Sequence, residues 1–443
     1  MALASLAALA EPRTILGIYL GLFALHFVAE HLLVLLNLRR AKANAGKQGN
    51  VPVEALALMS AEEYRRSQEY ASARGSLTLW SGTVQAAVAL ALILAGGLGG
   101  LQRLWERVAP GPQFAELAGI LLVFSVSLIF LIVELPVSIY GQFSVEARFG
   151  FNRLTPRLFV LDQLKGLALS AALGAPLLFL VFRLVRVSPR WWLWAFLAAA
   201  GLEVLLAVLY PRLIAPLFNR FTPLPEGEVR EQVESLAQRL GFRTRGIFLM
   251  DGSRRSSHGN AYFTGLGRAR RIVLFDTLLA SLSAPQVAAV LAHEIGHQKK
   301  LHVPLRLAGM LVGGLAAFWL LDRALAWEPL FRAFGFAGGG GAGAAGVGAA
   351  SAAPAAVVLL LFFAGPLSLV LRPLGSWLSR RQEYAADRYA YREAGCGESF
   401  TDALLALARG NLANPTPHPW TSFWFASHPT VLERVRALRG GGG

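Results

Sequence analysis

His293-Glu294-Ile295-Gly296-His297 follows Ser283-Ala284-Pro285, a string typical of the start of a helix. On a helix, residues four positions apart lie on one face, so His293 and His297 can each direct a ring nitrogen at a single ion. Two imidazoles at this spacing are typical of a tetrahedral zinc site, and the adjacent Glu294 can polarise a water molecule in the open coordination position. The same pattern also occurs by chance on ordinary amphipathic helices.

A second segment of helical character, 379–387, contains the acidic residues that such a site needs. A zinc peptidase with two histidines on one helix often takes its third ligand from a glutamate on a later helix. We therefore predict Glu383 as the third ligand, and Asp387 as the carboxylate that accepts the other N–H of a ligand histidine. Alternatively, both carboxylates pair with neighbouring arginines on a solvated face. His302 is not expected to be a ligand, because a third histidine at this distance requires an intervening glycine.

The composition indicates where this site lies in the cell. The chain has 443 residues, 55% of them hydrophobic, with long stretches almost free of charge. A helix needs about 20 predominantly apolar residues to cross a bilayer. Seven stretches meet this requirement: 14–37, 78–100, 117–140, 158–182, 191–213, 304–325 and 354–372. We predict a polytopic, mainly α-helical membrane protein.

The formal net charge of +15 does not indicate nucleic acid as a partner, because the basic residues flank the spans or lie in two large polar segments. With seven spans, four segments share one side of the membrane: 38–77, 141–157, 214–303 and 373–443. They carry most of the lysines and arginines, so the positive-inside rule predicts that they are cytoplasmic. Both halves of the zinc site then lie on one side, and the single cysteine, Cys396, fits a reducing compartment.

The spans and polar segments divide the chain into four parts. They are 1–213 with spans one to five, a catalytic segment at 214–303, 304–372 with spans six and seven and a Gly/Ala-rich connector at 338–346, and a second catalytic segment at 373–443. The first catalytic segment is expected to hold a helix at 228–240, strands at 246–250, 260–264 and 272–275, and then the two-histidine helix. This order predicts a small zincin-like α+β domain.

Further strings between about Tyr64 and Leu438 resemble those of the type I CAAX prenyl endopeptidases, which are integral-membrane zinc metallopeptidases. In addition to the two zinc-site segments they are Phe149-Gly150-Phe151-Asn152-Arg153 with Leu158-Phe159 and Asp162, Tyr210-Pro211 with Ala215-Pro216-Leu217-Phe218-Asn219, Ser256-Ser257-His258-Gly259-Asn260-Ala261-Tyr262-Phe263, and Ser427-His428-Pro429 with Glu433-Arg434. The resemblance implies a barrel of seven tilted helices that encloses a large water-filled chamber and is capped by the catalytic domain.

The resemblance also implies site roles. One zinc ion per chain is bound by His293, His297 and Glu383, while Glu294 is the general base and then the proton donor. His428 and Arg434 are implied to stabilise the oxyanion of the reaction. Asn260-Ala261 is implied to be an edge strand that pairs with an extended substrate. Without the family, His428 would be read as a turn residue before a proline and Arg434 as a surface charge.

Four ionisable residues fall within or near the predicted spans: His26, Glu30, Glu134 and Glu203. Such residues usually face a cavity or a partner, so these side chains either line an aqueous chamber or lie at the membrane interfaces. His26 and Glu30 are one helical turn apart, but without a third ligand nearby they do not predict a metal site.

We predict a membrane-embedded zinc endopeptidase that hydrolyses peptide bonds near the C-terminus of membrane-associated proteins, prenylated CAAX proteins among them. The partners are a peptide or protein substrate, lipidated or not, and membrane lipids. One alternative is a general quality-control metalloprotease for membrane proteins, and another is an inactive membrane scaffold or channel. Arginine greatly outnumbers lysine and alanine and glycine are abundant, so we expect a bacterial inner-membrane protein, for which a prenylated substrate would be unusual.

Overall fold

The computed structural model describes residues 11–45, 51–242, 244–264, 271–337 and 347–440. The Gly/Ala-rich connector at 338–346 lies outside the described residues. Within them, seven helices are long and apolar enough to cross a membrane, as predicted. Their main segments are α2 (Pro12–Ala45), α4 (Ala61–Leu94), α6 (Ala115–Tyr140), α7 (Pro156–Val187), α8 (Trp191–Leu209), α13 (His302–Leu325) and α15 (Val347–Arg388).

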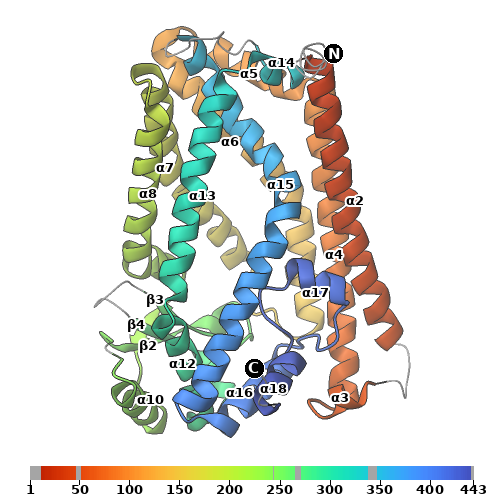
Figure 1. Cartoon of the computed structure of the whole chain (residues 1–443), viewed down its shortest axis with the longest axis vertical. Helices are drawn as coiled ribbons and strands as arrows, with labels where there is room; N and C mark the ends of the chain where they lie inside the picture. The colour runs from red at the N-terminus through yellow and green to blue at the C-terminus, as the bar shows by residue number, and fades with distance from the viewer. Residues whose placement is uncertain (1–10, 46–50, 243, 265–270, 338–346, 441–443) are drawn as a thin grey trace.

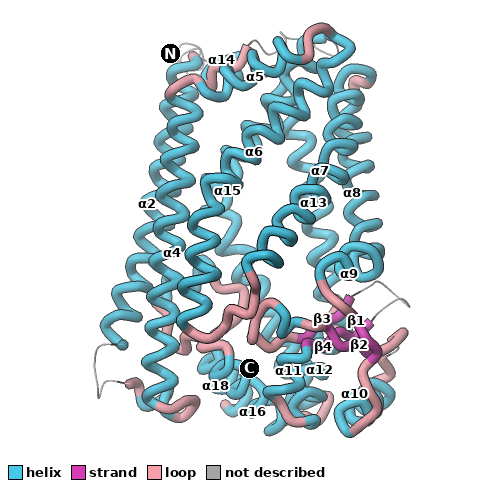
Figure 2. The backbone as a smooth tube through the Cα atoms, turned by 180° about the vertical axis from the view of Figure 1, so that it is seen from behind, coloured by secondary structure: helices cyan, strands magenta, loops and turns pink. Residues whose placement is uncertain are grey.

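The seven membrane helices form a closed ring. In the order α2, α4, α6, α7, α8, α13 and α15, each helix packs against the next, and α15 packs against α2. Figures 1 and 2 show these helices running along the long axis of the molecule, with all the strands at one end and α5 and α14 at the other. A ring of helices satisfies every backbone hydrogen bond internally, as the hydrocarbon core requires. Many large apolar side chains remain exposed on the helices, including Leu25, Val28, Leu305 and Met310, as expected of a surface that contacts lipid.

The ring is filled at the end remote from the sheet. There the first part of α15 also packs against α6 and α7, and a buried apolar cluster includes Tyr19, Leu122, Phe182 and Phe334. Short helices lie at this end and along the connections: α3 (Val53–Leu56), α5 (Gly97–Val108), η1 (Pro112–Phe114), η2 (Gly141–Glu146), η3 (Tyr210–Ile214), α9 (Ala215–Phe218) and α14 (Glu328–Ala333). Figure 1 places α5 and α14 over the filled end. A buried apolar core therefore occupies this end of the ring.

The helices differ from the predicted spans at their ends. The second span was expected to reach residue 100, but α4 ends at Leu94, where Gly96 adopts a left-handed conformation (φ 69°), and α5 follows as a separate helix. The largest difference is α15, which joins the predicted seventh span and the predicted helix 379–387 into one helix of 42 residues. Its internal Pro354, Pro366 and Pro373 would normally end a helix, but neighbouring helices stabilise such interruptions inside membranes.

The catalytic elements gather at the other end of the ring (Figures 1 and 2). A four-stranded sheet has the order β1-β2-β4-β3, in which β2 and β4 are parallel and the outer pairs antiparallel. The elements are β1 (Phe221–Pro223), α10 (Glu228–Arg239), β2 (Ile247–Met250), η4 (Gly252–Arg254), β3 (Ala261–Thr264), β4 (Arg271–Phe275), α11 (Asp276–Ser281), α12 (Ala284–Lys299), η6 (Tyr389–Glu393), α16 (Gly397–Gly410), α17 (Pro419–Phe425) and α18 (Val431–Arg439). The helix and three strands expected here are present, and β1 was not predicted because its three residues include a proline.

The filled end yields a stability prediction. A Cβ atom at Gly119 of α6 would lie 2.4 Å from Cγ of Pro354 and 3.0 Å from Cε2 of Phe182. We expect Gly119→Ala to lower the free energy of unfolding by about 1–3 kcal/mol, the usual cost of overpacking. Thermal or denaturant unfolding in one detergent measures this. Gly201→Ala on α8 is the control, because a Cβ there meets no heavy atom within 4 Å; an equal loss in both variants would contradict the prediction.

Candidate metal centre

The helix α12 carries both histidines, and its local sequence explains its position. The side chain of Gln286 accepts a hydrogen bond of 2.9 Å from the backbone N–H of Ser283 and so satisfies an amide at the start of the helix. One face of α12, including Ala289 and Ala292, is fully buried in the apolar core of the catalytic domain. Burial of this face determines how the helix is rotated and turns His293 and His297 toward α15.

The close crossing of α12 and α15 depends on Gly296. A Cβ at this position would lie 3.1 Å from Cα of Ala386 and 3.1 Å from Cβ of Tyr389, which is tighter than almost all real contacts of a Cβ atom. The glycine between the two histidines therefore lets the backbones approach each other. The approach brings Glu383 and Asp387, one turn apart on α15, against the histidine pair.

Three side chains meet in an arrangement that fits a metal ion. The Nε2 atoms of His293 and His297 are 3.2 Å apart, and they lie 3.5 and 3.3 Å from the two carboxylate oxygens of Glu383. Metal–ligand bonds of 2.0–2.1 Å in a tetrahedron place the ligand atoms about 3.3–3.4 Å apart. Among the described residues, these three form the one group of histidine, cysteine or acidic side chains that could hold a metal. The two nitrogens and one oxygen are a donor set that suits zinc.

Asp387 and Arg434 form a buried layer behind His293. Oδ1 of Asp387 lies 2.9 Å from Nδ1 of His293, the ring nitrogen that faces away from the three donor atoms. The guanidinium of Arg434 on α18 donates to both oxygens of Asp387 at 2.8 and 2.5 Å. Asp387 is 1% exposed, so its charge requires these partners. This is the contact expected of a carboxylate that orients a ligand histidine.

The solvated face considered for Glu383 and Asp387 is contradicted by their burial, since Glu383 is only 3% exposed. Arg380, one of the neighbouring arginines in that alternative, instead donates to backbone carbonyls of the chain just before His428, those of Ser422 at 3.0 Å and Ala426 at 2.8 Å. It thereby ties α15 to the segment that carries His428.

His428 and Glu294 complete the surroundings of the three donors. Nε2 of His428 lies 3.4 Å from Oε1 of Glu383, and its side chain is 63% exposed, so it lies at the open side of the group. Burial raises the pKa of the Glu294 carboxyl above its ordinary value. A carboxyl group with a raised pKa is suited to take and return a proton near neutral pH.

The strand β3 begins directly after Asn260. It is an edge of the sheet, and it lies beside α12. The carbonyl of Asn260 accepts from the amide of Phe275 on β4 at 3.1 Å. Because successive residues of a strand direct their backbone groups to opposite edges, those of Ala261 point to the open edge. The structure therefore places the expected edge strand next to the helix that carries the histidines.

Other strings that carried the family resemblance hold the catalytic domain on the membrane helices. Arg255 donates to both oxygens of Asp162 on α7, at 2.8 and 3.0 Å, and to Oδ1 of Asn219 at 2.8 Å. The backbone of Phe151 accepts from the amide of Ser257 at 3.2 Å. These contacts anchor the chain just before β3.

Sequence reasoning missed a contact of His302. It was set aside as a metal ligand and does not belong to the group of three donors. Nevertheless, its Nδ1 atom lies 2.9 Å from Nδ1 of His297, and its side chain is buried. The signal in the sequence was a histidine five residues after His297, but its direction depends on a backbone turn that spacing does not reveal.

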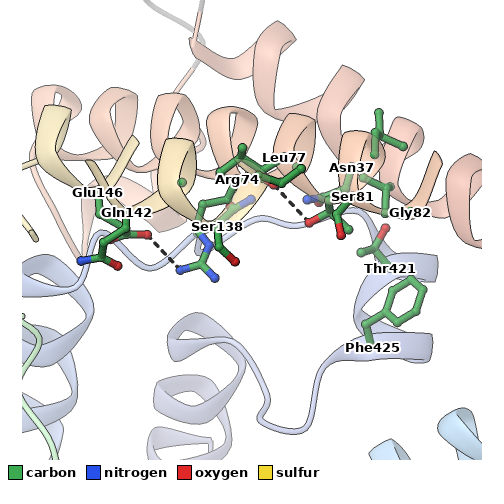
Figure 3. A pocket seen from close by; sticks show the side chains of 18 of the residues that line it. Asn37, Arg74, Leu77, Ser81, Gly82, Ser138, Gln142, Glu146, Thr421 and Phe425 are labelled. Atoms are coloured by element: carbon green, nitrogen blue, oxygen red, sulfur yellow. Dashed lines mark hydrogen bonds and ion pairs between the residues drawn. The ribbon is translucent and has the colours of Figure 1, made fainter. Parts of the chain in front are cut away.

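A cavity of about 1080 Å³ occupies the interior of the ring at its catalytic end. Figure 3 shows Arg74 of α4 close to Gln142 and Glu146 of η2, with Thr421 and Phe425 contributed by α17. Glu30 and Glu134 also line this cavity, as expected for a chamber, whereas His26 and Glu203 are not among its lining residues. Ser256 and His258, which precede β3, line it as well, so the cavity reaches the region of the edge strand.

Fold and site together define a polytopic membrane metalloendopeptidase. Residues 42–220 match the description "CAAX prenyl protease N-terminal, five membrane helices", and residues 223–441 match Peptidase family M48. The chain belongs to this family of peptidases. It is 38% identical to CAAX prenyl protease 1 of Saccharomyces cerevisiae over 312 residues, 69% of either chain.

Two further relatives are similar over most of the chain. The CAAX prenyl protease 1 homolog of Homo sapiens is 29% identical over 432 residues, which cover 88% of this chain and 89% of that one. The crystal structure of Ste24p from S. mikatae superposes with a TM-score of 0.85 at 30% identity and covers 95% of this chain and 99% of that one. The predicted seven-helix fold and the predicted class of enzyme are thus confirmed, and the inactive scaffold is set aside.

Proposed function

We propose that this protein is a zinc endopeptidase that cleaves membrane-associated proteins near their C-termini, with prenylated CAAX proteins as the substrate class suggested by the names of its relatives. The observation that carries the proposal is the group formed by His293, His297 and Glu383, whose donor atoms have tetrahedral spacing on a helix that lies beside an edge strand. A cavity inside the ring of membrane helices reaches the segment that leads to this strand. Such a cavity can admit a substrate that is held at the membrane.

The three donors would hold the zinc ion. When bound, a zinc ion in such a site acts as a Lewis acid toward the scissile carbonyl and lowers the pKa of water. Glu294 takes the proton of the attacking water and delivers it to the leaving nitrogen. Asp387 fixes the tautomer of His293, so that Nε2 is free to donate its lone pair.

The remaining roles concern the substrate. His428, at the open side of the site, donates to the oxyanion that develops on the carbonyl. Arg434 contributes positive charge to the same region, although two of its donors are already bound to Asp387, so part of its effect passes through that carboxylate. The open edge at Asn260-Ala261 pairs with the extended substrate backbone.

The metal site is tested by His297→Ala. We expect this variant to lose most of its zinc, because two remaining donors cannot complete a tetrahedral site. Metal analysis of purified protein measures the occupancy. Lys299→Ala, at an exposed position on the same helix, is the matched control and should retain one zinc per chain. Full zinc occupancy in His297→Ala would exclude the proposed ligand set.

The role of Glu294 is tested by Glu294→Gln. The substitution keeps the shape of the side chain and all three ligands, but it removes the carboxylate that accepts the proton. We expect normal zinc occupancy and hydrolysis slower by about two orders of magnitude or more, the scale of general-base catalysis. A variant that cleaves a peptide at close to the wild-type rate would rule out Glu294 as the base.

The substrate class is tested with a matched pair of peptides, one of them prenylated. Burial of an alkyl chain contributes about 0.8 kcal/mol per methylene group, so a lipid that enters the apolar part of the cavity or its surroundings strengthens binding. We expect lipidation to change the apparent affinity much more than the turnover number, both measured in one detergent. Equal affinities would favour a quality-control protease that recognises extended backbone alone.

We further propose that the catalytic end faces the cytoplasm of a bacterial inner membrane. Cys396, the one cysteine of the sequence, lies beside α16 at the catalytic end and can report the orientation. We expect a membrane-impermeant maleimide to label it in inverted vesicles and not in intact spheroplasts, with detergent-solubilised protein defining full labelling. Cys396→Ser is the unlabelled control, and labelling in spheroplasts would reverse the assigned orientation.

A further inference from the structure

The turn between α12 and α13 connects the catalytic helix to a membrane span in only two residues. Helix α12 ends at Lys299, and α13 begins at His302. Between them, Leu301 adopts a left-handed conformation with φ 59°, one of two described non-glycine residues with a positive φ. A branched apolar side chain is disfavoured there, and such strain persists where the surrounding structure requires it. The turn places His302 against the last turn of α12, where it contacts His297.

The contact between the two histidines has a defined donor and acceptor once a metal is bound. Nε2 of His297 lies beside the other two donor atoms, so Nδ1 must carry the proton of the neutral ring. That proton points at Nδ1 of His302, 2.9 Å away. His302 can accept it only as the tautomer with its own proton on Nε2. The ligand His297 is therefore held by a neutral acceptor, whereas His293 faces the carboxylate of Asp387.

The first turn of α13 also contacts the helix that carries the third ligand. Arg306, one turn after His302, donates to Oε1 of Gln382 at 2.6 Å, and Gln382 precedes Glu383. Both His302 and Gln382 are buried. The first turn of α13 thus contacts His297 on α12 directly. It also contacts Gln382 on α15, which is next to Glu383.

We propose that His302 is a positioning residue that fixes the tautomer and the ring orientation of His297, and that the strained turn at Leu301 holds it in place. The membrane span α13 thereby helps to set the affinity of the site for zinc. The inference rests on the proposed metal site, and it adds a residue that does not itself bind the ion.

The test compares two substitutions of His302, one that keeps a hydrogen-bond acceptor and one that removes it. Asn can place an amide oxygen close to the position of the histidine Nδ1 atom, whereas Leu has similar volume and no acceptor. We expect His302→Leu to raise the dissociation constant for zinc, measured by chelator competition, by about 10- to 100-fold, the usual effect of losing such a partner. His302→Asn should stay within a few-fold of the wild type. Val303→Ala, at an exposed neighbouring position, is the control.

A spectroscopic measurement separates positioning from general stability. With cobalt in place of zinc, the visible absorption of His302→Leu should shift because the imidazole of His297 is reoriented, while that of His302→Asn should match the wild type. The melting temperatures of the metal-free proteins show whether either variant is simply less folded. Wild-type zinc affinity and an unchanged spectrum in His302→Leu would overturn the proposal, as would an equal loss in His302→Asn.

The role of the turn is tested separately by two substitutions of Leu301. Leu301→Gly keeps the left-handed conformation at no steric cost and should retain wild-type zinc affinity, whereas Leu301→Val, β-branched at a positive φ, should weaken it. Equal zinc affinities in the two Leu301 variants would overturn the role of the turn. If His297→Ala retains zinc, the metal site itself is wrong; if only His302→Leu retains it, the site stands and the positioning role falls.

Discussion

The active centre depends on how closely two helices cross at Gly296. A tetrahedral site needs three donors about 3.3 Å apart, and here two come from α12 and one from α15. Their backbones must approach until a Cβ at Gly296 would be 3.1 Å from Cα of Ala386. Ala292, Ala386 and Ala390, all fully buried, have small side chains that let the two backbones stay close around Gly296. Any larger residue in this layer would separate the donors and widen the site.

The length of α15 joins this crossing to the membrane. The helix carries Arg372 in the wall of the cavity and Glu383 at the metal site, three turns further on. Arg372 donates to Glu30 of α2 at 2.7 Å, so the first and last spans are linked within the ring. A displacement of α15 in the membrane would therefore move Glu383, the proposed third ligand. The metal centre cannot be regarded as a soluble domain that is merely anchored by helices.

Charged side chains inside the ring are tolerated because they find partners there. Glu134 accepts hydrogen bonds from Ser81 at 2.7 Å and Gln85 at 2.9 Å. Glu146 accepts from Tyr70 at 2.8 Å and lies 3.6 Å from Nε2 of His258, in the segment that leads to the edge strand. Partly buried polar groups of this kind persist inside a membrane protein when they have partners. Together with the apolar residues around them, they give the cavity both polar and apolar walls.

The sequence by itself determined the features that arise within one or two helical turns. The four-residue spacing places His293 beside His297, long apolar stretches specify seven spans, and short strand-like runs predict three of the four strands. The prediction of Glu383 as third ligand joined two segments 90 residues apart, and it relied on the known chemistry of such sites. The structure places Glu383 at the expected position, although its role stays a prediction.

Only the tertiary structure decided the features that depend on contacts between distant segments. The seventh span and the helix at 379–387 were predicted as separate segments, but they form one helix whose three internal prolines are accommodated by neighbouring helices. In the alternative of a solvated face, neighbouring arginines would pair with Glu383 and Asp387. Arg380 instead donates to the backbone of Ser422, and Arg434 from the last helix pairs with Asp387. His302 became a partner of His297 through one left-handed residue, whose conformation no spacing rule predicts. Local periodicity specifies which face a side chain occupies, whereas its partner is specified by the packing of the whole ring.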